Sequence, residues 1–187
     1  MGSVLGKAME PPREESVLSA IATLYEVGAI EGDQQLTSLG HHLAKLPVDV
    51  RIDKMMLHGA VFGCLAPILT IAACLSHKSP FISPKDEKSN AERAKLSLLS
   101  EKTDSGIGGN IASGQQSDHL LLVISYNRWV KILRQRGGAA ARDFCRSYFL
   151  SSPTLYMIRD MRIQFGSLLA DIGFIKLPKD CILMWHQ

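Results

Sequence analysis

Apolar residues recur at helical spacing along most of the chain, and short polar or glycine-containing joints separate these runs. The first run lies in residues 14–25 and is followed by Gly28, a residue type that often ends a helix. Residues 29–36 are typical of a short strand and turn, and Thr37 or Ser38 is placed to cap a second helix before Pro47. We therefore predict a tail at residues 1–9 and a small winged-helix module at 10–52, with an irregular helical hairpin as the alternative.

The pattern from residue 53 to 174 predicts a helical bundle. A helix beginning at Asp49 or Asp53 breaks near Gly63, and Pro67 starts the next one. Because both helices are apolar on almost every side, we expect them at the buried centre of the bundle. Residues 86–102 predict an amphipathic surface helix.

The end of the chain predicts three further helices. One runs from a cap at Ser117 to about Arg136, and a second covers residues 139–150 after a glycine pair. In the third, Ser152 is the expected cap with Pro153 at the first helical position, and Gly173 ends it. With a C-terminal tail at 175–187, the fold class is mainly α.

Residues 105–116, SGIGGNIASGQQ, form a glycine-rich stretch between two of these helices. A phosphate-binding loop would carry GK[ST] and follow an apolar strand, and both features are missing here. We interpret the stretch as a flexible insertion in the bundle.

Hydrophobic residues make up 46% of the chain and charged residues 21%, which fits a folded protein. The four cysteines (Cys64, Cys74, Cys145 and Cys181) form no CxxC pair, and the apolar surroundings of the first three favour buried, reduced thiols. No Ser/Cys–His pair or zinc-like spacing is present, so we expect no catalytic residue and no metal. No signal peptide or membrane span is evident, so we expect a soluble intracellular protein, first in the cytoplasm, with nucleus or organelle as alternatives.

Charge is unevenly distributed along the chain. Residues 1–111 have a net charge of −2 and residues 112–187 a net charge of +5, and the second part holds seven of the ten arginines. A polyanion would therefore meet the C-terminal half, although basic side chains often make only surface ion pairs. The candidate phosphate-binding residues lie on three successive predicted helices: Arg128, Lys131, Arg134, Arg142, Arg146, Arg159 and Arg162.

Several blocks of the sequence resemble, in order, the helicase-associated region of DEAH/DExH-box RNA helicases. They are KAMEPP, LTSLGHHLAKLPVDVRI, KMMLHGAVFGC, LTIAACLSHKSPF, SDHLLL with YNRW, CRSYFLS and MRIQFGSLLADIGF. The resemblance covers residues 4–174. Pro153 stands where relatives often carry an arginine, so an RNA contact from that position is not carried over.

The resemblance implies a winged helix followed by a ratchet bundle, which together close an RNA channel against two RecA-like motor domains, usually followed by an OB-fold. The chain itself has no GxxxxGK[ST] and no DExH tetrad, so we expect ATP and Mg only on motor domains outside it. We predict an accessory region that grips the backbone of single-stranded RNA without reading its sequence. A scaffold that docks a protein or ribosomal surface is the alternative; a DNA-binding winged helix is disfavoured because residues 37–46 offer only Lys45 and two histidines.

Overall fold

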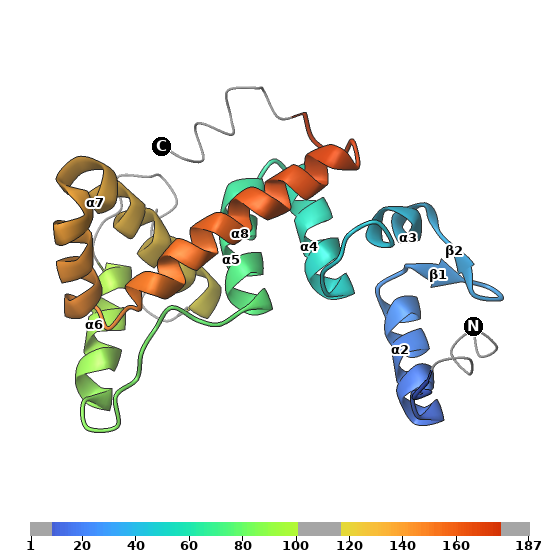
Figure 1. Cartoon of the computed structure of the whole chain (residues 1–187), viewed down its shortest axis with the longest axis horizontal. Coiled ribbons are helices and arrows are strands. Elements are labelled where there is room, and N and C mark those ends of the chain that lie inside the picture. The colour runs from blue at the N-terminus through green and yellow to red at the C-terminus, as the bar shows by residue number, and fades with distance from the viewer. Residues whose placement is uncertain (1–8, 101–116, 177–187) are drawn as a thin grey trace. The chain divides into compact units, whose positions relative to one another are not determined.

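The computed structural model describes residues 9–100 and 117–176. The predicted insertion at 105–116 therefore lies outside the described residues, as do nearly all of the tail at 1–9 and most of the tail at 175–187. In the described ranges the protein has seven helices and two short strands, which confirms the mainly α fold (Figure 1). It divides into two compact units after Lys54. The domain bounds at 10–52 and 53–174 stay a prediction.

The first unit contains a helix, a two-stranded sheet and a second helix, in the predicted order. Helix α2 (Glu14–Glu26) is followed by Gly28, whose φ of 74° favours glycine. Strands β1 (Ile30–Glu31) and β2 (Gln35–Leu36) pair antiparallel, and α3 (Ser38–Leu43) follows. Thr37 is the cap of α3: its hydroxyl accepts a hydrogen bond from the Gly40 N–H and donates one to the Gly28 carbonyl.

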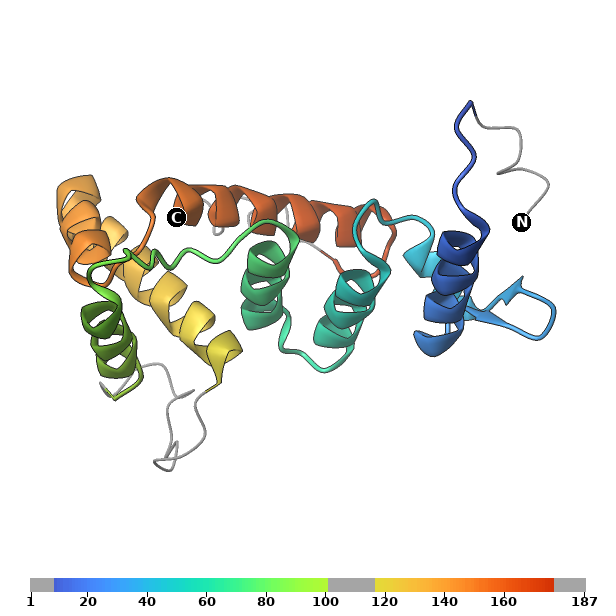
Figure 2. The same cartoon turned by 90° about the horizontal axis from the view of Figure 1, so that it is seen from below.

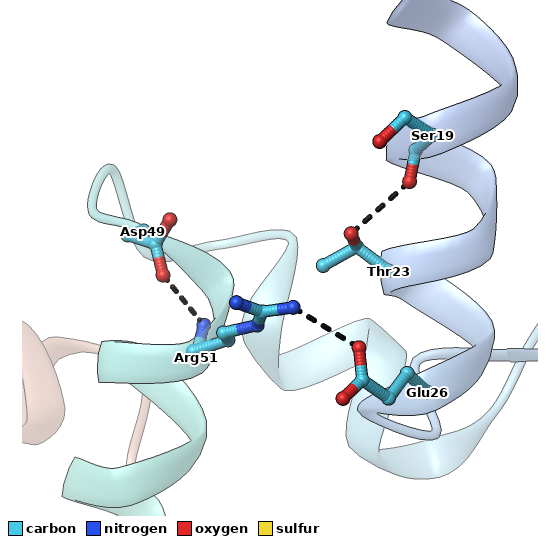
Figure 3. A network of polar contacts seen from close by, with 5 residues as sticks. All are labelled: Ser19, Thr23, Glu26, Asp49 and Arg51. Atoms are coloured by element: carbon cyan, nitrogen blue, oxygen red, sulfur yellow. Dashed lines mark hydrogen bonds and ion pairs between the residues drawn. The ribbon is translucent and has the colours of Figure 1, made fainter.

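Polar contacts connect α2 with the start of α4 (Val50–Val61) in this unit (Figure 3). The Arg51 guanidinium lies 3.0 Å from a Glu26 carboxylate oxygen, and the Arg51 N–H donates to the Asp49 carboxylate at 2.9 Å. Both side chains of the ion pair are mostly exposed, so it contributes roughly 1 kcal/mol or less. The Asp49 carboxylate is an N-terminal cap of α4, one of the two starts that the sequence predicts.

The second unit is a bundle in which α5 lies against α7 and α8 (Figures 1 and 2). Helix α5 (Leu65–Ser76) buries every residue from Leu69 to Cys74, and α8 (Ser152–Asp171) packs along it. Helix α6 (Lys88–Ser100) packs on α7 (Asp118–Ser147) through Ala91 and Leu98, both of which are buried. The prediction that α5 lies at the buried centre is confirmed.

The end of α4 differs from the prediction. Met56 and Leu57 are buried as expected, but Phe62 is 75% exposed and Val61 is also exposed. Gly59 explains the close approach of α4 and α5, since a Cβ there would lie 3.0 Å from the Ile68 side chain. Gly63, with a left-handed φ of 69°, turns the chain directly after Phe62. Apolar residues on almost every side of α4 therefore did not lead to burial of every side of this helix.

Two helix starts are shifted by a few residues from their predicted positions. Helix α5 begins at Leu65, so Pro67 lies inside its first turn, where a missing N–H breaks no helical bond. The cap of α8 is Ser151 and not Ser152: the Ser151 hydroxyl accepts a hydrogen bond from the Thr154 N–H. Helices α7 and α8 are joined by a turn at Phe149, whose φ is 52°.

The loop after α5 runs beside this turn. The Ser151 N–H donates to the Pro80 carbonyl at 2.8 Å, and the Ile82 N–H donates to the Phe149 carbonyl at 2.7 Å. Phe81 and Leu150 form an isolated antiparallel bridge. This loop is thus hydrogen-bonded to the residues just before α8, including its cap Ser151.

Candidate nucleic-acid interface

The seven basic residues predicted to bind phosphate all lie on α7 and α8, but they differ in exposure. Lys131, Arg134, Arg142 and Arg146 are exposed, and Arg128 and Arg159 are partly exposed. Arg162 is only 8% exposed. The expectation that every one of these side chains lies on the surface is therefore wrong for Arg162.

The Arg162 side chain reaches into the bundle and contacts two other helices. Its Nη1 donates a hydrogen bond to the Ala66 carbonyl at 2.9 Å and another to the Thr70 hydroxyl, both on α5. Its guanidinium also lies over the Tyr126 ring of α7, 4.5 Å from the ring centroid. Burial lowers the pKa of Arg162, and these contacts offset the cost of taking its charge out of water.

Tyr126 of α7 lies under the guanidinium of Arg162 of α8. Burial raises the pKa of its hydroxyl, and the nearby charges of Arg162, Arg159 and Arg134 oppose that rise. We call Arg134 of α7 and Arg159 of α8 the α7–α8 basic pair. Arg159 also lies 5.1 Å from the Tyr156 ring centroid and binds the Asp160 carboxylate at 3.0 Å.

The remaining candidates divide between the two segments of α7. Gly137 interrupts this helix with φ 78° and ψ 179°, which separates Arg128 and Lys131 on the first segment from Arg142 and Arg146 on the second. The two segments point in different directions (Figures 1 and 2). Arg146 forms an ion pair with Asp143 at 3.4 Å. The basic residues of α7 therefore do not lie along one straight line.

The sequence contained a signal for the burial of Arg162 that we did not use. The buried positions Leu155, Ile158, Arg162, Phe165 and Leu169 follow a strict three–four spacing. Arg162 lies in the middle of that series and not beside it. Its partners Tyr126 and Thr70 were not predicted, because no local pattern connects residues so distant in sequence.

Other kinds of site find little support among the described residues. Cys74 and Cys145 are buried as predicted, and burial raises the pKa of Cys74 to about 12, but Cys64 is exposed. Cys64 lies between the left-handed Gly63 and the first residue of α5, next to the exposed Val61 and Phe62. Within residues 9–100 and 117–176, no three His, Cys, Asp or Glu side chains gather into a possible metal site, and no helix there is long and apolar enough to cross a membrane.

Two family models match adjoining parts of the chain. The winged-helix part of the helicase-associated domain (HA2) matches residues 20–48, and its ratchet-like part matches residues 49–122. The chain belongs to the helicase-associated domain family. This confirms both the resemblance and the predicted fold, a winged-helix part followed by a ratchet-like part.

Relatives of this HA2 region are DExH-box helicases. The DExH-box ATP-dependent RNA helicase DExH4, chloroplastic, of Arabidopsis thaliana is 57% identical over 176 residues, which cover 94% of this chain and 12% of that protein. The ATP-dependent DNA/RNA helicase DHX36 of Homo sapiens is 42% identical over 94% of this chain and 16% of that protein. The putative ATP-dependent RNA helicase DHX57 of Mus musculus is 41% identical over 93% and 12%. The chain thus spans less than a fifth of these relatives.

Proposed function

We propose that this HA2 region is the accessory part of an ATP-dependent DExH-box RNA helicase, where it helps to form the RNA channel and grips the backbone of single-stranded RNA. Support comes from the family and from relatives whose names describe ATP-dependent RNA helicases. ATP and Mg would bind motor domains of the RecA type elsewhere in such a protein, and an OB-fold would be a further neighbour. On this proposal the HA2 region has no ATPase of its own.

The observation that carries the RNA-binding proposal is the α7–α8 basic pair. Arg134 is exposed on α7 and Arg159 is partly exposed on α8, and these two helices pack against each other. Arg128 and Lys131 precede Arg134 at three-residue intervals on the same segment of α7. Guanidinium groups bind phosphate oxygens in a bidentate manner, and such contacts recognise backbone without regard to base sequence.

Binding of a fluorescein-labelled single-stranded RNA to the 187-residue chain tests this proposal. We expect the double variant Arg134→Gln/Arg159→Gln to bind at least tenfold more weakly at low salt. Because each lost phosphate contact on a single strand lowers the slope of log K against log salt by about 0.7, the slope should fall by about 1.4. Arg93→Gln on α6 is the matched control and should change neither quantity. If the double variant and the native chain had equal affinity and equal slope, binding of the RNA backbone by Arg134 and Arg159 would be rejected.

A protein-docking role is the second candidate function. Val61 and Phe62 are exposed at the end of α4, and Ile82 is exposed in the loop between α5 and α6. Such apolar surface is suited to another protein or to a ribosomal protein. Co-purification of a protein with the native chain after nuclease treatment, and its loss in Phe62→Ser, would favour this role. The compartment stays open between cytoplasm and organelle, because one relative is named chloroplastic.

A further inference from the structure

Arg162 is a buried cation whose hydrogen bonds are directed at one face of a neighbouring helix. Its two acceptors on α5, the Ala66 carbonyl and the Thr70 hydroxyl, lie four residues apart and so on adjacent turns of the same face. Thr70 is fully buried, with 0% exposure. These bonds therefore fix both the separation of α5 and α8 and their position along each other, which apolar contacts alone specify poorly.

Aromatic rings continue from Arg162 to the partly exposed Arg159. Arg162 lies on the Tyr126 ring, whose centroid is 5.9 Å from that of Trp129. The fully buried Trp129 meets Tyr156 edge to face at 4.9 Å, and Arg159 lies over Tyr156 at 5.1 Å. The two arginines of α8 are thus joined by a continuous series of contacts through α7. We therefore expect a shift of the Arg162 guanidinium to displace the Tyr126 ring of α7, against which it lies.

We propose that Arg162 is a positioning residue for RNA binding. It holds α8 against α5 and α7, and in this way it sets the places of Arg159 and Arg134 without contacting RNA itself. The inference rests on the proposed function, since the α7–α8 basic pair is the element being positioned. A basic side chain in a family of RNA helicases would otherwise be assigned to phosphate, and the burial of Arg162 argues for the other role.

Three substitutions separate positioning from direct contact in the RNA-binding experiment. Thr70→Val removes an acceptor at a site that RNA cannot reach, and we expect it to weaken RNA binding several-fold, as Arg162→Met does. Because both variants displace the α7–α8 basic pair, both should lower the salt slope, and to a similar extent. Arg162→Lys keeps the charge but loses the planar fork, so it should not restore native affinity. Native affinity in Thr70→Val, full rescue by lysine, or a slope that falls in Arg162→Met but not in Thr70→Val would each overturn the proposal.

A stability measurement separates failure of this inference from failure of the proposed function. In urea unfolding, a double-mutant cycle of Arg162→Met and Thr70→Val should show coupling of at least fivefold in the unfolding equilibrium constant, because each variant breaks the same hydrogen bond. Additive effects would show that the two residues are not coupled and overturn the positioning role even if RNA binds. If the native chain binds no RNA, the proposed function and the positioning role both fail, and the cycle still decides whether Arg162 connects α5 and α8.

Discussion

The α-carbon of Gly40 lies so close to the Ala29 carbonyl that a Cβ added to Gly40 would be 1.9 Å from that oxygen. The carbonyl has little freedom to move, since it also accepts a hydrogen bond from the Thr37 N–H at 3.0 Å. The start of α3 therefore rests directly on the residue before β1. Only a residue without a side chain fits at this contact.

We expect Gly40→Ala to destabilise the first unit by about 3 kcal/mol or more, because the new methyl group would overlap backbone that cannot shift cheaply. Urea unfolding followed by far-ultraviolet circular dichroism measures the effect. Gly166→Ala in α8 is the matched control: nothing lies within 4 Å of its Cβ position, so the variant should gain roughly 0.5–1 kcal/mol. A Gly40→Ala chain as stable as the native one would contradict the contact.

Thr37 should be replaceable by serine but not by alanine. Its hydroxyl bonds the Gly40 N–H at 3.0 Å and the Gly28 carbonyl at 2.7 Å, so it caps α3 and holds the end of α2 at once. Loss of a helix cap costs about 1–2 kcal/mol, and we expect Thr37→Ala at the upper end of that range. Thr37→Ser keeps both bonds and should lose well under half as much in the same unfolding experiment. Equal losses for the two variants would mean that the methyl group, and not the hydroxyl, stabilises this corner.

Asp53 should make the stability of the chain fall between pH 4 and pH 6. It is 1% exposed, and burial, with a smaller contribution from the charge of Asp49, raises its pKa from 3.8 to about 6. Between pH 4 and pH 6 the folded chain therefore keeps a proton on Asp53 that the unfolded chain releases. The contribution of Asp53 to stability is largest below pH 4 and is lost as the pH rises through 6. Asp53→Asn cannot lose a proton, and its advantage over the native chain should grow by on the order of 2–3 kcal/mol between pH 4 and pH 7.

Urea titrations at several pH values measure this difference. Asp49→Asn provides a second readout, because removing its charge should lower the pKa of Asp53 as followed by NMR. A difference between Asp53→Asn and the native chain that stays constant with pH would show that Asp53 titrates normally in the fold.

Alkylation should distinguish Cys64 from the buried thiols. In a Cys181→Ser background, chosen because Cys181 is outside the described residues, iodoacetamide at pH 8 should modify Cys64 of the folded chain and leave Cys74 untouched. Burial raises the pKa of Cys74 to about 12, so very little of this thiol is in the reactive thiolate form at pH 8. Burial also keeps iodoacetamide away from its sulfur. Mass spectrometry after digestion locates the label, and Cys64→Ser should remove the fast reaction. Labelling of Cys74 at the rate seen in urea would contradict its burial.

The sequence predicted those parts of the fold that short-range chemistry controls. Glycines at 28, 63, 137 and 173 have positive φ values and end or interrupt helices where the pattern indicated. Thr37 and Ser117 cap the helices that they were expected to cap. These outcomes depend on a few neighbouring residues, so the local sequence contains the information.

Long-range contacts explain what the sequence did not predict. Phe62 belongs to an apolar run yet is exposed where that run ends, directly before the left-handed Gly63. Arg162 carries a charge yet is buried, because Thr70, Ala66 and Tyr126 supply partners from distant segments. Hydropathy describes one residue at a time, and neither outcome follows from it. The RNA-binding role of the other six basic residues stays a prediction.

The backbone angles of Gly137 give α7 a fixed bend. At φ 78° and ψ 179° the residue occupies a region essentially closed to other amino acids, so replacing it would force the two segments toward a new relative direction. A ligand that follows Arg128, Lys131 and Arg134 along the first segment must change course to meet Arg142 and Arg146. The angle between two positively charged tracks is therefore set at one uncharged, side-chain-free position.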